Sequence, residues 1–146
     1  MPAFARLLAV DRPDEIAIRD HRQALRWTDV DDVLNRVANG LGSIDLGPAR
    51  RVAVFAENAV ETALAHLGGL LAGASTVPVN FHLTADETAY ILPPPQTRVL
   101  FVGAETAERG LAAARQAGVD TVVGWYCDGI DGITDWHEWL AGAAST

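Results

Sequence analysis

The chain has 146 residues, a formal net charge of −8 and a hydrophobic fraction of 49%. These values are ordinary for one globular domain and argue against a disordered chain. They also disfavour nucleic acid as a partner, because the eleven basic residues are all arginines scattered among nineteen acids, whereas a phosphate backbone requires clustered positive charge.

The N-terminal region predicts one short helix and then two strands around a polar turn, over residues 4–10, 16–18 and 24–27. Thr28 is expected to cap the next helix, with Asp31 as its capping-box partner. Apolar residues recur at helical spacing in that helix, which indicates one buried face. Gly42 is expected to end it.

From residue 51 onward, strand and helix patterns alternate. Compact apolar runs predict strands buried on both faces, at residues 52–55, 76–79, 99–102 and 121–123. Asn58 is expected to cap the helix after the first of these strands, with Glu61 as its box partner. Thr84 and Glu87 form the same arrangement at the start of the helix after the second strand.

Two further helices complete the pattern. The helix that begins at Thr84 is expected to end at the prolines 93–95. The next covers residues 105–117 and ends at Gly118, and Asp135 caps a last amphipathic helix that runs to Leu140. Repeated strand–helix units predict an α/β fold, in which a parallel-rich sheet is flanked by helices and preceded by an N-terminal β-hairpin.

Most residues that could carry chemistry have a structural interpretation. Ser75 lies in a segment that resembles a nucleophile elbow, but the final glycine is absent and a strand follows it. His137 has no second histidine at zinc-protease spacing. Asp128 begins a segment that resembles a calcium loop, but Trp139 stands at its twelfth position. We therefore expect no catalytic residue and no metal site in this chain.

Other small or aromatic residues are assigned to packing. The acidic residues 29, 31 and 32 complement the start of a helix. Gly68 and Gly69 are expected to allow a close helix–sheet contact. The tryptophans at positions 125, 136 and 139 are expected to form a local core cluster.

The sequence gives no targeting or membrane-spanning signal. Its most apolar window, residues 63–79, contains His66 and Pro78 and predicts a core helix followed by a strand. The lone Cys127 rules out an internal disulfide and fits a reducing compartment. We therefore expect a soluble, cytoplasmic protein.

Several local motifs follow one another in a fixed order. They are residues 13–18 with 25–28, residues 35–41, residues 51–54 with Glu57 and Asn58, residues 73–84 with Glu87 and 90–92, and residues 98–101. As an ordered set they resemble the adenylate-forming enzymes of the acyl-CoA synthetase and luciferase superfamily. The segment 73–84 is the most similar to fatty-acyl-CoA and aryl-CoA ligases, and the prolines 93–95 depart from the family pattern.

The resemblance implies that residues 1–146 are the N-terminal portion of the large AMP-binding domain, an incomplete N-terminal subdomain of the adenylate-forming fold. The parent reaction would be ATP-dependent adenylation of a carboxylate, followed by transfer of the acyl group to a thiol, usually that of coenzyme A. The family's phosphate loop, its magnesium-binding acid and its catalytic lysines do not occur here, and the chain contains no lysine. This chain is therefore predicted to be inactive by itself, although its parent would use ATP, Mg and CoA.

The resemblance also implies a place where CoA could approach. By analogy with CoA-using members, Asn80, Phe81, His82 and Arg109 are candidate CoA contacts. Arg109 could donate to a phosphate and Phe81 could stack on a base. The alternative stays open that Asn80 shapes a turn, Phe81 fills a gap and Arg109 is a solvated helix charge.

Two readings of the chain's role remain. In the first, it is a segment of a ligase, its partner is the remainder of that enzyme, and it binds no cofactor tightly alone. In the second, it is a naturally short module that homodimerises through exposed apolar surface or docks onto a full-length ligase. A small nucleotide-binding domain of the flavodoxin type is disfavoured, because no strand-to-helix turn provides a phosphate cradle.

Overall fold

The structure is a computed structural model that describes residues 3–92 and 96–146. Its centre is a five-stranded sheet in the order β4-β3-β5-β6-β7, with every neighbouring pair parallel. The strands are β3 (Arg51–Phe55), β4 (Ser75–Val79), β5 (Thr97–Val102), β6 (Thr121–Gly124) and β7 (Thr134–Asp135). The predicted α/β class is confirmed. The expected helix end at residues 93–95 lies outside the described residues.

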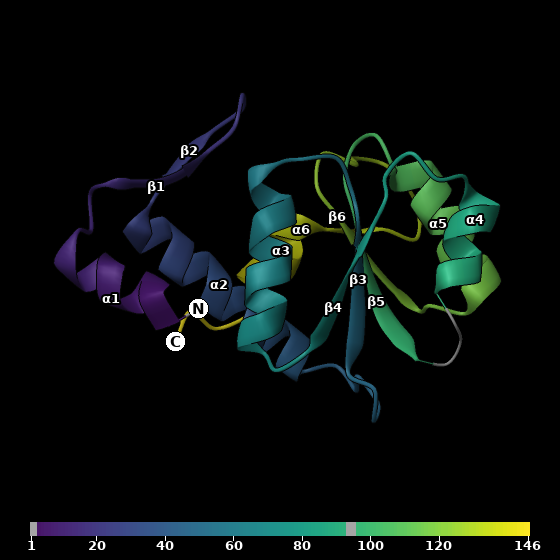
Figure 1. Cartoon of the computed structure of the whole chain (residues 1–146), viewed down its shortest axis with the longest axis horizontal. Helices are drawn as coiled ribbons and strands as arrows, with labels where there is room; N and C mark the ends of the chain where they lie inside the picture. Colours follow the sequence, from purple (N-terminus) through teal and green to yellow (C-terminus); the bar gives the residue numbers. More distant parts are fainter. Residues whose placement is uncertain (1–2, 93–95) are drawn as a thin grey trace.

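Helices cover both faces of the sheet (Figure 1). They are α1 (Ala3–Asp11), α2 (Trp27–Gly42), α3 (Val60–Leu71), α4 (Ala85–Ile91), α5 (Ala107–Ala117) and α6 (Trp136–Ala141). One core cluster joins the sheet to α2, α3 and α6, and the other joins it to α4 and α5. Alternate residues of β3 supply the two clusters, as Val54 lies in the first and Phe55 in the second, so the strand is buried on both faces.

The four predicted strands are present, each extended by one or two residues. Strand β7 was not predicted. It consists of only Thr134 and Asp135, which are exposed and half-buried, so no apolar run marks it in the sequence. Strand β4 forms one edge of the sheet and carries Pro78, which pairs with Val54.

The N-terminal hairpin consists of β1 (Ile16–Arg19) and β2 (Ala24–Arg26), as a separate antiparallel sheet. Its turn is closed by Asp20, whose Oδ1 accepts hydrogen bonds from the backbone N–H groups of Arg22 and Gln23. The other oxygen of Asp20 accepts the N–H of Val60 at the start of α3, at 2.9 Å. The hairpin and α3 are thus joined by one carboxylate.

Two predicted helix caps are wrong. Helix α2 begins at Trp27, and Asp29 rather than Asp31 accepts the backbone N–H of Arg26. Thr28 is the second residue of the helix rather than its cap, and its hydroxyl donates to the carbonyl of Pro13 at 2.9 Å. Asp31 instead pairs with Arg6 at 3.1 Å.

At α3, the predicted cap Asn58 makes no capping bond, since the cap position is Ala59 and Asp20 supplies the acceptor. A carboxylate is a stronger acceptor than an amide oxygen for a helix N-terminus. Glu61, the predicted box partner, is buried and bonded elsewhere.

Two other predicted helix starts are confirmed. Thr84 and Glu87 form a reciprocal capping box, and Asp135 accepts the N–H of Glu138 at 3.1 Å. Helix α5 ends at Gly118, which adopts a left-handed φ of 72°. It begins two residues later than predicted, with Thr106 at the cap position; the Thr106 hydroxyl makes no capping bond and donates instead to the carbonyl of Phe55.

Close packing accounts for the small and aromatic residues. A Cβ at Gly69 would collide with Thr76 of β4, which confirms the predicted helix–sheet contact. A Cβ at Gly68 would collide with Val37, so this glycine serves a contact between α3 and α2 instead. The three tryptophans form the expected core cluster, in which Trp136 lies edge-on to Trp125 at 5.3 Å and tilted against Trp139 at 6.2 Å.

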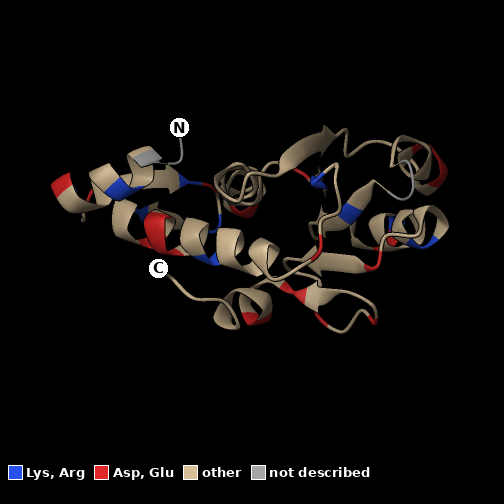
Figure 2. Ribbon diagram, turned by 90° about the horizontal axis from the view of Figure 1, so that it is seen from below, with Lys and Arg blue, Asp and Glu red and all other residues tan. Residues whose placement is uncertain are grey.

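Acidic and basic residues are scattered over the ribbon, and the basic residues do not gather into one stripe (Figure 2). Ion pairs within the described ranges join arginines to acids, and one of them links α2 to α1 through Asp31 and Arg6. Among the described residues, no helix combines the length and the apolarity needed to cross a bilayer.

Candidate functional site at the carboxyl edge of the sheet

The order of the strands creates a switch point between β3 and β5. From β3 the chain passes through α3 to β4 on one side, and then crosses through α4 to β5 on the other side of β3. In open α/β sheets, ligands bind outside the carboxyl ends of the strands at such a point. The carboxyl ends of β3, β5 and β6 therefore define the first place to look for a site.

A small pocket of about 110 Å³ lies at this edge. Loops that are far apart in the sequence converge on it: the hairpin turn, the β3–α3 loop, the β5–α5 loop and the segment after β6. Its lining residues are His21, Arg22, Glu57, Asn58, Ala59, Glu105 and Tyr126. The pocket thus carries both basic and acidic groups.

Glu57 occupies the space where the side chain of residue 103 would lie. A Cβ at Gly103 would come within 2.5 Å of Glu57 Oε1, so the glycine leaves room for the carboxylate. Glu57 Oε2 is buried and has no hydrogen-bond partner among the described residues. A buried acceptor without a donor costs free energy, which makes this carboxylate a feature that packing alone does not explain.

Tyr126 connects this pocket to a buried carboxylate. Its backbone has a left-handed φ of 56°, which is unusual for an aromatic residue. Its hydroxyl donates to Glu61 Oε1 at 2.8 Å, and the guanidinium of Arg22 lies 3.7 Å from the ring centroid. Burial raises the pKa of Tyr126, and the hydrogen bond to Glu61 raises it further.

Cys127, next in the chain, is not a nucleophile at neutral pH. Burial raises the pKa of its thiol to about 11, with the charge of Glu57 as the next cause. The thiol donates to the carbonyl of Trp125 at 3.0 Å. The residue therefore stays protonated and acts as part of the core.

The predicted CoA loop begins where edge strand β4 ends. Asn80 shapes the loop, because its Oδ1 accepts the N–H of His82 at 3.0 Å and its carbonyl accepts the N–H of Leu83 at 3.1 Å. The rings of Phe81 and His82 lie 4.1 Å apart, with Phe81 half-buried and His82 exposed. Three of the four predicted residues therefore lie together because they are consecutive.

Arg109 joins this loop from helix α5, across 26 residues of sequence. Its guanidinium donates to the carbonyl of Leu83 at 2.6 Å and to that of Glu105 at 3.2 Å. It also lies over the ring of Phe55, 5.4 Å from the centroid. Because Glu105 lines the switch-point pocket, Arg109 links the predicted loop to that pocket.

None of the four predicted residues lines the switch-point pocket itself. Sequence reasoning did not single out Arg22, Glu105 or Tyr126, which the fold brings there from separate loops. The only signal in the sequence was their position, after a strand or in the hairpin turn. No glycine marks the left-handed backbone at Tyr126. Within the described ranges, no three His, Cys, Asp or Glu side chains are arranged to hold a metal ion.

Comparison with known proteins places this geometry in a family. The family model described as AMP-binding enzyme matches residues 7–136, a range that includes β3 to β6 and the loops just described. The chain belongs to the AMP-binding enzyme family. This confirms the resemblance drawn from the ordered motifs.

Individual relatives of this AMP-binding chain include CoA ligases and peptide synthetases. It is 29% identical over 100 residues to the 4-hydroxybenzoate–CoA/benzoate–CoA ligase of Rhodopseudomonas palustris, a match that covers 68% of this chain and 19% of that ligase. It is 34% identical over 113 residues to the cyclosporin synthetase of Tolypocladium inflatum, covering 76% of this chain and 1% of that protein. The chain thus spans at most a fifth of these two relatives.

The fold agrees with solved structures of the family. The benzoate CoA ligase from Burkholderia xenovorans superposes with a TM-score of 0.84 at 21% identity, over 98% of this chain and 28% of that chain. The whole described architecture is therefore that of one part of the adenylate-forming fold.

Proposed function

We propose that this chain is the N-terminal portion of the large AMP-binding domain of an ATP-dependent carboxylate–CoA ligase. In the parent reaction, a carboxylate attacks the α-phosphate of ATP to give an acyl-adenylate and pyrophosphate. The thiol of CoA then displaces AMP to give the thioester. A fatty acid or a related carboxylate is the proposed substrate, with ATP, Mg and CoA as the parent's cofactors.

The observation that supports this proposal most strongly is that the match with a solved ligase spans nearly all of this chain but only a small part of the ligase. The benzoate CoA ligase structure covers 98% of this chain, while this chain covers only 28% of that enzyme. The 146 residues contain no lysine, so they offer no lysine ammonium to neutralise charge that develops on phosphate during adenylation. We therefore propose that these residues have a structural role and do not catalyse the reaction by themselves.

For CoA, the loop after β4 is the proposed edge of the binding path. The half-buried Phe81 and exposed His82 present a pair of rings that a base could stack on. Arg109 donates to the carbonyls of Leu83 and Glu105. Because a guanidinium has five N–H donors, donors remain for a phosphate. Asn80 holds the turn that presents the two rings. Because the lone free Cys127 fits a reducing compartment, we place the parent enzyme in the cytoplasm.

Two experiments test this function. The purified chain should show no ATP–pyrophosphate exchange with fatty or aryl acids, and measurable exchange would overturn its catalytic incompetence. In a full-length ligase carrying this segment, Phe81→Ala and Arg109→Ala should weaken CoA binding in a calorimetric titration. Unchanged CoA affinity in both variants would remove the site assignment.

The second candidate is a stand-alone module that homodimerises or docks onto a full-length ligase. It is favoured by the outer face of α1, where Phe4, Leu7 and Val10 are 59%, 64% and 79% exposed. The DNA downstream of Thr146 discriminates the two candidates. An open frame that encodes a Gly-rich loop ending in Lys supports the ligase segment, and a stop codon supports the module.

A further inference from the structure

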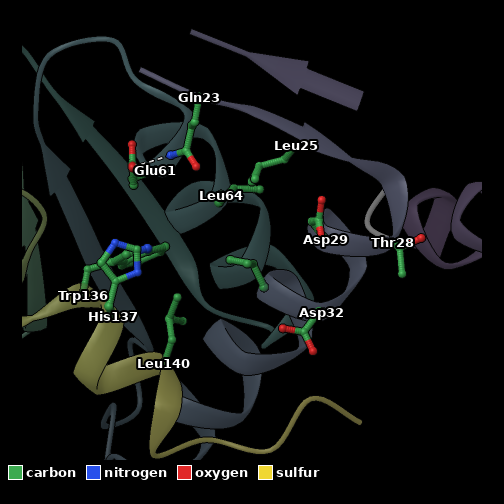
Figure 3. A pocket seen from close by; sticks show the side chains of 11 residues that line it. Gln23, Leu25, Thr28, Asp29, Asp32, Glu61, Leu64, Trp136, His137 and Leu140 are labelled. Atoms are coloured by element: carbon green, nitrogen blue, oxygen red, sulfur yellow. Dashed lines mark hydrogen bonds between the residues drawn. The ribbon is translucent and has the colours of Figure 1, made fainter. Parts of the chain in front are cut away.

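A groove lies between the hairpin, α2, α3 and α6 (Figure 3). Its volume is about 470 Å³. Its lining residues are Gln23, Leu25, Thr28, Asp29, Asp32, Val33, Glu61, Leu64, Trp136, His137 and Leu140. Leu64, Trp136 and Leu140 form an apolar floor, with Leu25 and Val33 half-buried beside it.

Carboxylates stand around this apolar floor. Asp29 and Asp32 project from α2 on one side, and Glu61 lies on the α3 side (Figure 3). Asp32 is paired with Arg36 at 2.9 Å. Asp29 and Glu61 have no ion-pair partner within the part of the chain that the structure describes. No arginine lines the groove, so its rim is net negative.

Besides the apolar floor and the aspartates of α2, the groove has a buried carboxylate, Glu61, in its wall. The residue is only 1% exposed, yet it is a carboxylate. Its Oε1 accepts hydrogen bonds from Gln23 Nε2 at 2.6 Å and from the Tyr126 hydroxyl at 2.8 Å, while Oε2 is buried without any partner. A buried charge without a counter-charge is costly. Glu61 Oε2 is not accessible from the groove, so this carboxylate adds to the negative potential of the wall rather than providing a contact atom.

We propose that this groove binds a polypeptide segment that carries apolar and basic side chains, supplied by the remainder of the ligase. The apolar floor would take Leu-like side chains, and Asp29 and Asp32 would take Lys or Arg beside them, with the buried charge of Glu61 adding to the attraction. A second copy of this chain is a poorer occupant, because two molecules of net charge −8 repel each other. The proposal rests on the proposed function, since the enzyme's remainder supplies the segment.

The test uses the purified 146-residue chain and a synthetic amphipathic helix of Leu and Lys as the probe. Backbone amide NMR shifts should change first at Leu25, Val33 and Leu140 as the probe is added. A helix with Glu in place of Lys should not bind, and one with Ser in place of Leu should bind at least about tenfold more weakly. Equal binding of the Ser and Leu helices would overturn the proposal, because attraction to net charge alone would explain it.

Matched variants locate the effect. The double variant Asp29→Asn with Asp32→Asn should weaken probe binding about tenfold. The control is Asp128→Asn with Asp131→Asn, which removes the same charge from a separate acidic hollow beside β7 and should leave affinity unchanged. Equal weakening in both double variants would contradict the proposal. NMR shifts of groove residues that change with the concentration of the chain, in the absence of probe, would also contradict the proposal. They would show that a second copy of the chain occupies the groove.

A separate experiment distinguishes failure of the groove proposal from failure of the proposed ligase function. The proposed function requires that fusion of this segment to the remainder of a ligase gives ATP–pyrophosphate exchange. Exchange by the fusion together with absent probe binding would reject the groove alone. Binding at the groove together with an inactive fusion would reject the ligase assignment and leave the groove's chemistry in place.

Discussion

The carboxylate of Asp20 and the backbone N–H of Val60 lie 2.9 Å apart, so the turn of the hairpin provides the first acceptor of helix α3. This bond is the largest of the causes that lower the pKa of Asp20 below 3.8, and the N–H groups of Arg22 and Gln23 add to it. A helix that receives its N-terminal acceptor from another element gains stability only when both elements are formed.

Replacing Asp20 tests this link. Asp20→Ala should lower the free energy of unfolding by about 1 kcal/mol, near the middle of the range for caps because water still reaches the carboxylate. Since the folded-state pKa is depressed, the contribution is fully present above the unfolded value of about 3.8 and is lost as pH falls through the folded value. Urea unfolding at pH 7 and pH 3 should therefore show a difference from wild type that shrinks at pH 3. The exposed Asp131→Ala serves as the control.

Gly68 sets the distance between α2 and α3. Gly68→Ala should destabilise the protein by about 2–3 kcal/mol, because a Cβ there collides with Val37. Gly42→Ala is the matched control in the same helical layer, since a Cβ at Gly42 meets nothing within 4 Å. It should be neutral or stabilising by up to about 1 kcal/mol, because alanine favours helix. Thermal unfolding of the two variants measures the contrast, and equal effects would contradict the close approach.

Arg109 is expected to hold the loop after β4. Arg109→Met removes its bonds to the carbonyls of Leu83 and Glu105, at a cost of about 1–2 kcal/mol. Hydrogen exchange should then accelerate at the amides of His82 and Leu83 before it changes in the sheet. Arg115→Met on the same helix is the control, because Arg115 makes no hydrogen bond or ion pair among the described residues. Unchanged exchange in the loop would show that Asn80 alone maintains its shape.

Tyr126 can be titrated by itself, because the chain has two tyrosines and the second, Tyr90, is 88% exposed. In a Tyr90→Phe background, tyrosinate absorbance should report a pKa for Tyr126 above 10. Adding Glu61→Gln should lower that pKa, because it removes a charge and keeps an acceptor of similar size. Val60→Ala is the comparison variant, because it perturbs the first turn of α3 next to Glu61 without changing a charge. An unaltered pKa in the Glu61 variant would assign the shift to burial alone.

The sequence predicted features that depend on neighbours in the chain. The four apolar runs became strands, and the capping box of Thr84 and Glu87 formed because its partners are three residues apart. The caps proposed for Thr28 and Asn58 were wrong. Thr28 and Asn58 are bypassed because other residues hold those helix starts: Asp29 accepts the N–H of Arg26 at α2, and Asp20, far away in sequence, accepts the N–H of Val60 at α3.

The site was predicted less completely than the fold for the same physical reason. Asn80, Phe81 and His82 are consecutive, so a motif could single them out. Arg22, Glu61 and Tyr126 come together only through the hairpin, α3 and the segment after β6. Neither the left-handed backbone of Tyr126 nor the partnerless oxygen of Glu61 leaves a periodic trace that sequence reading can detect.

The proline in edge strand β4 has a consequence for how this protein behaves at high concentration. Fibrils grow when an incoming strand finds a continuous row of open N–H and C=O groups along a sheet edge. Pro78 interrupts that row because its ring has no N–H, and the opposite edge, β7, is only two residues long. Strand-by-strand aggregation should therefore be slow, which leaves the apolar outer face of α1 as the surface through which crowded molecules would first adhere.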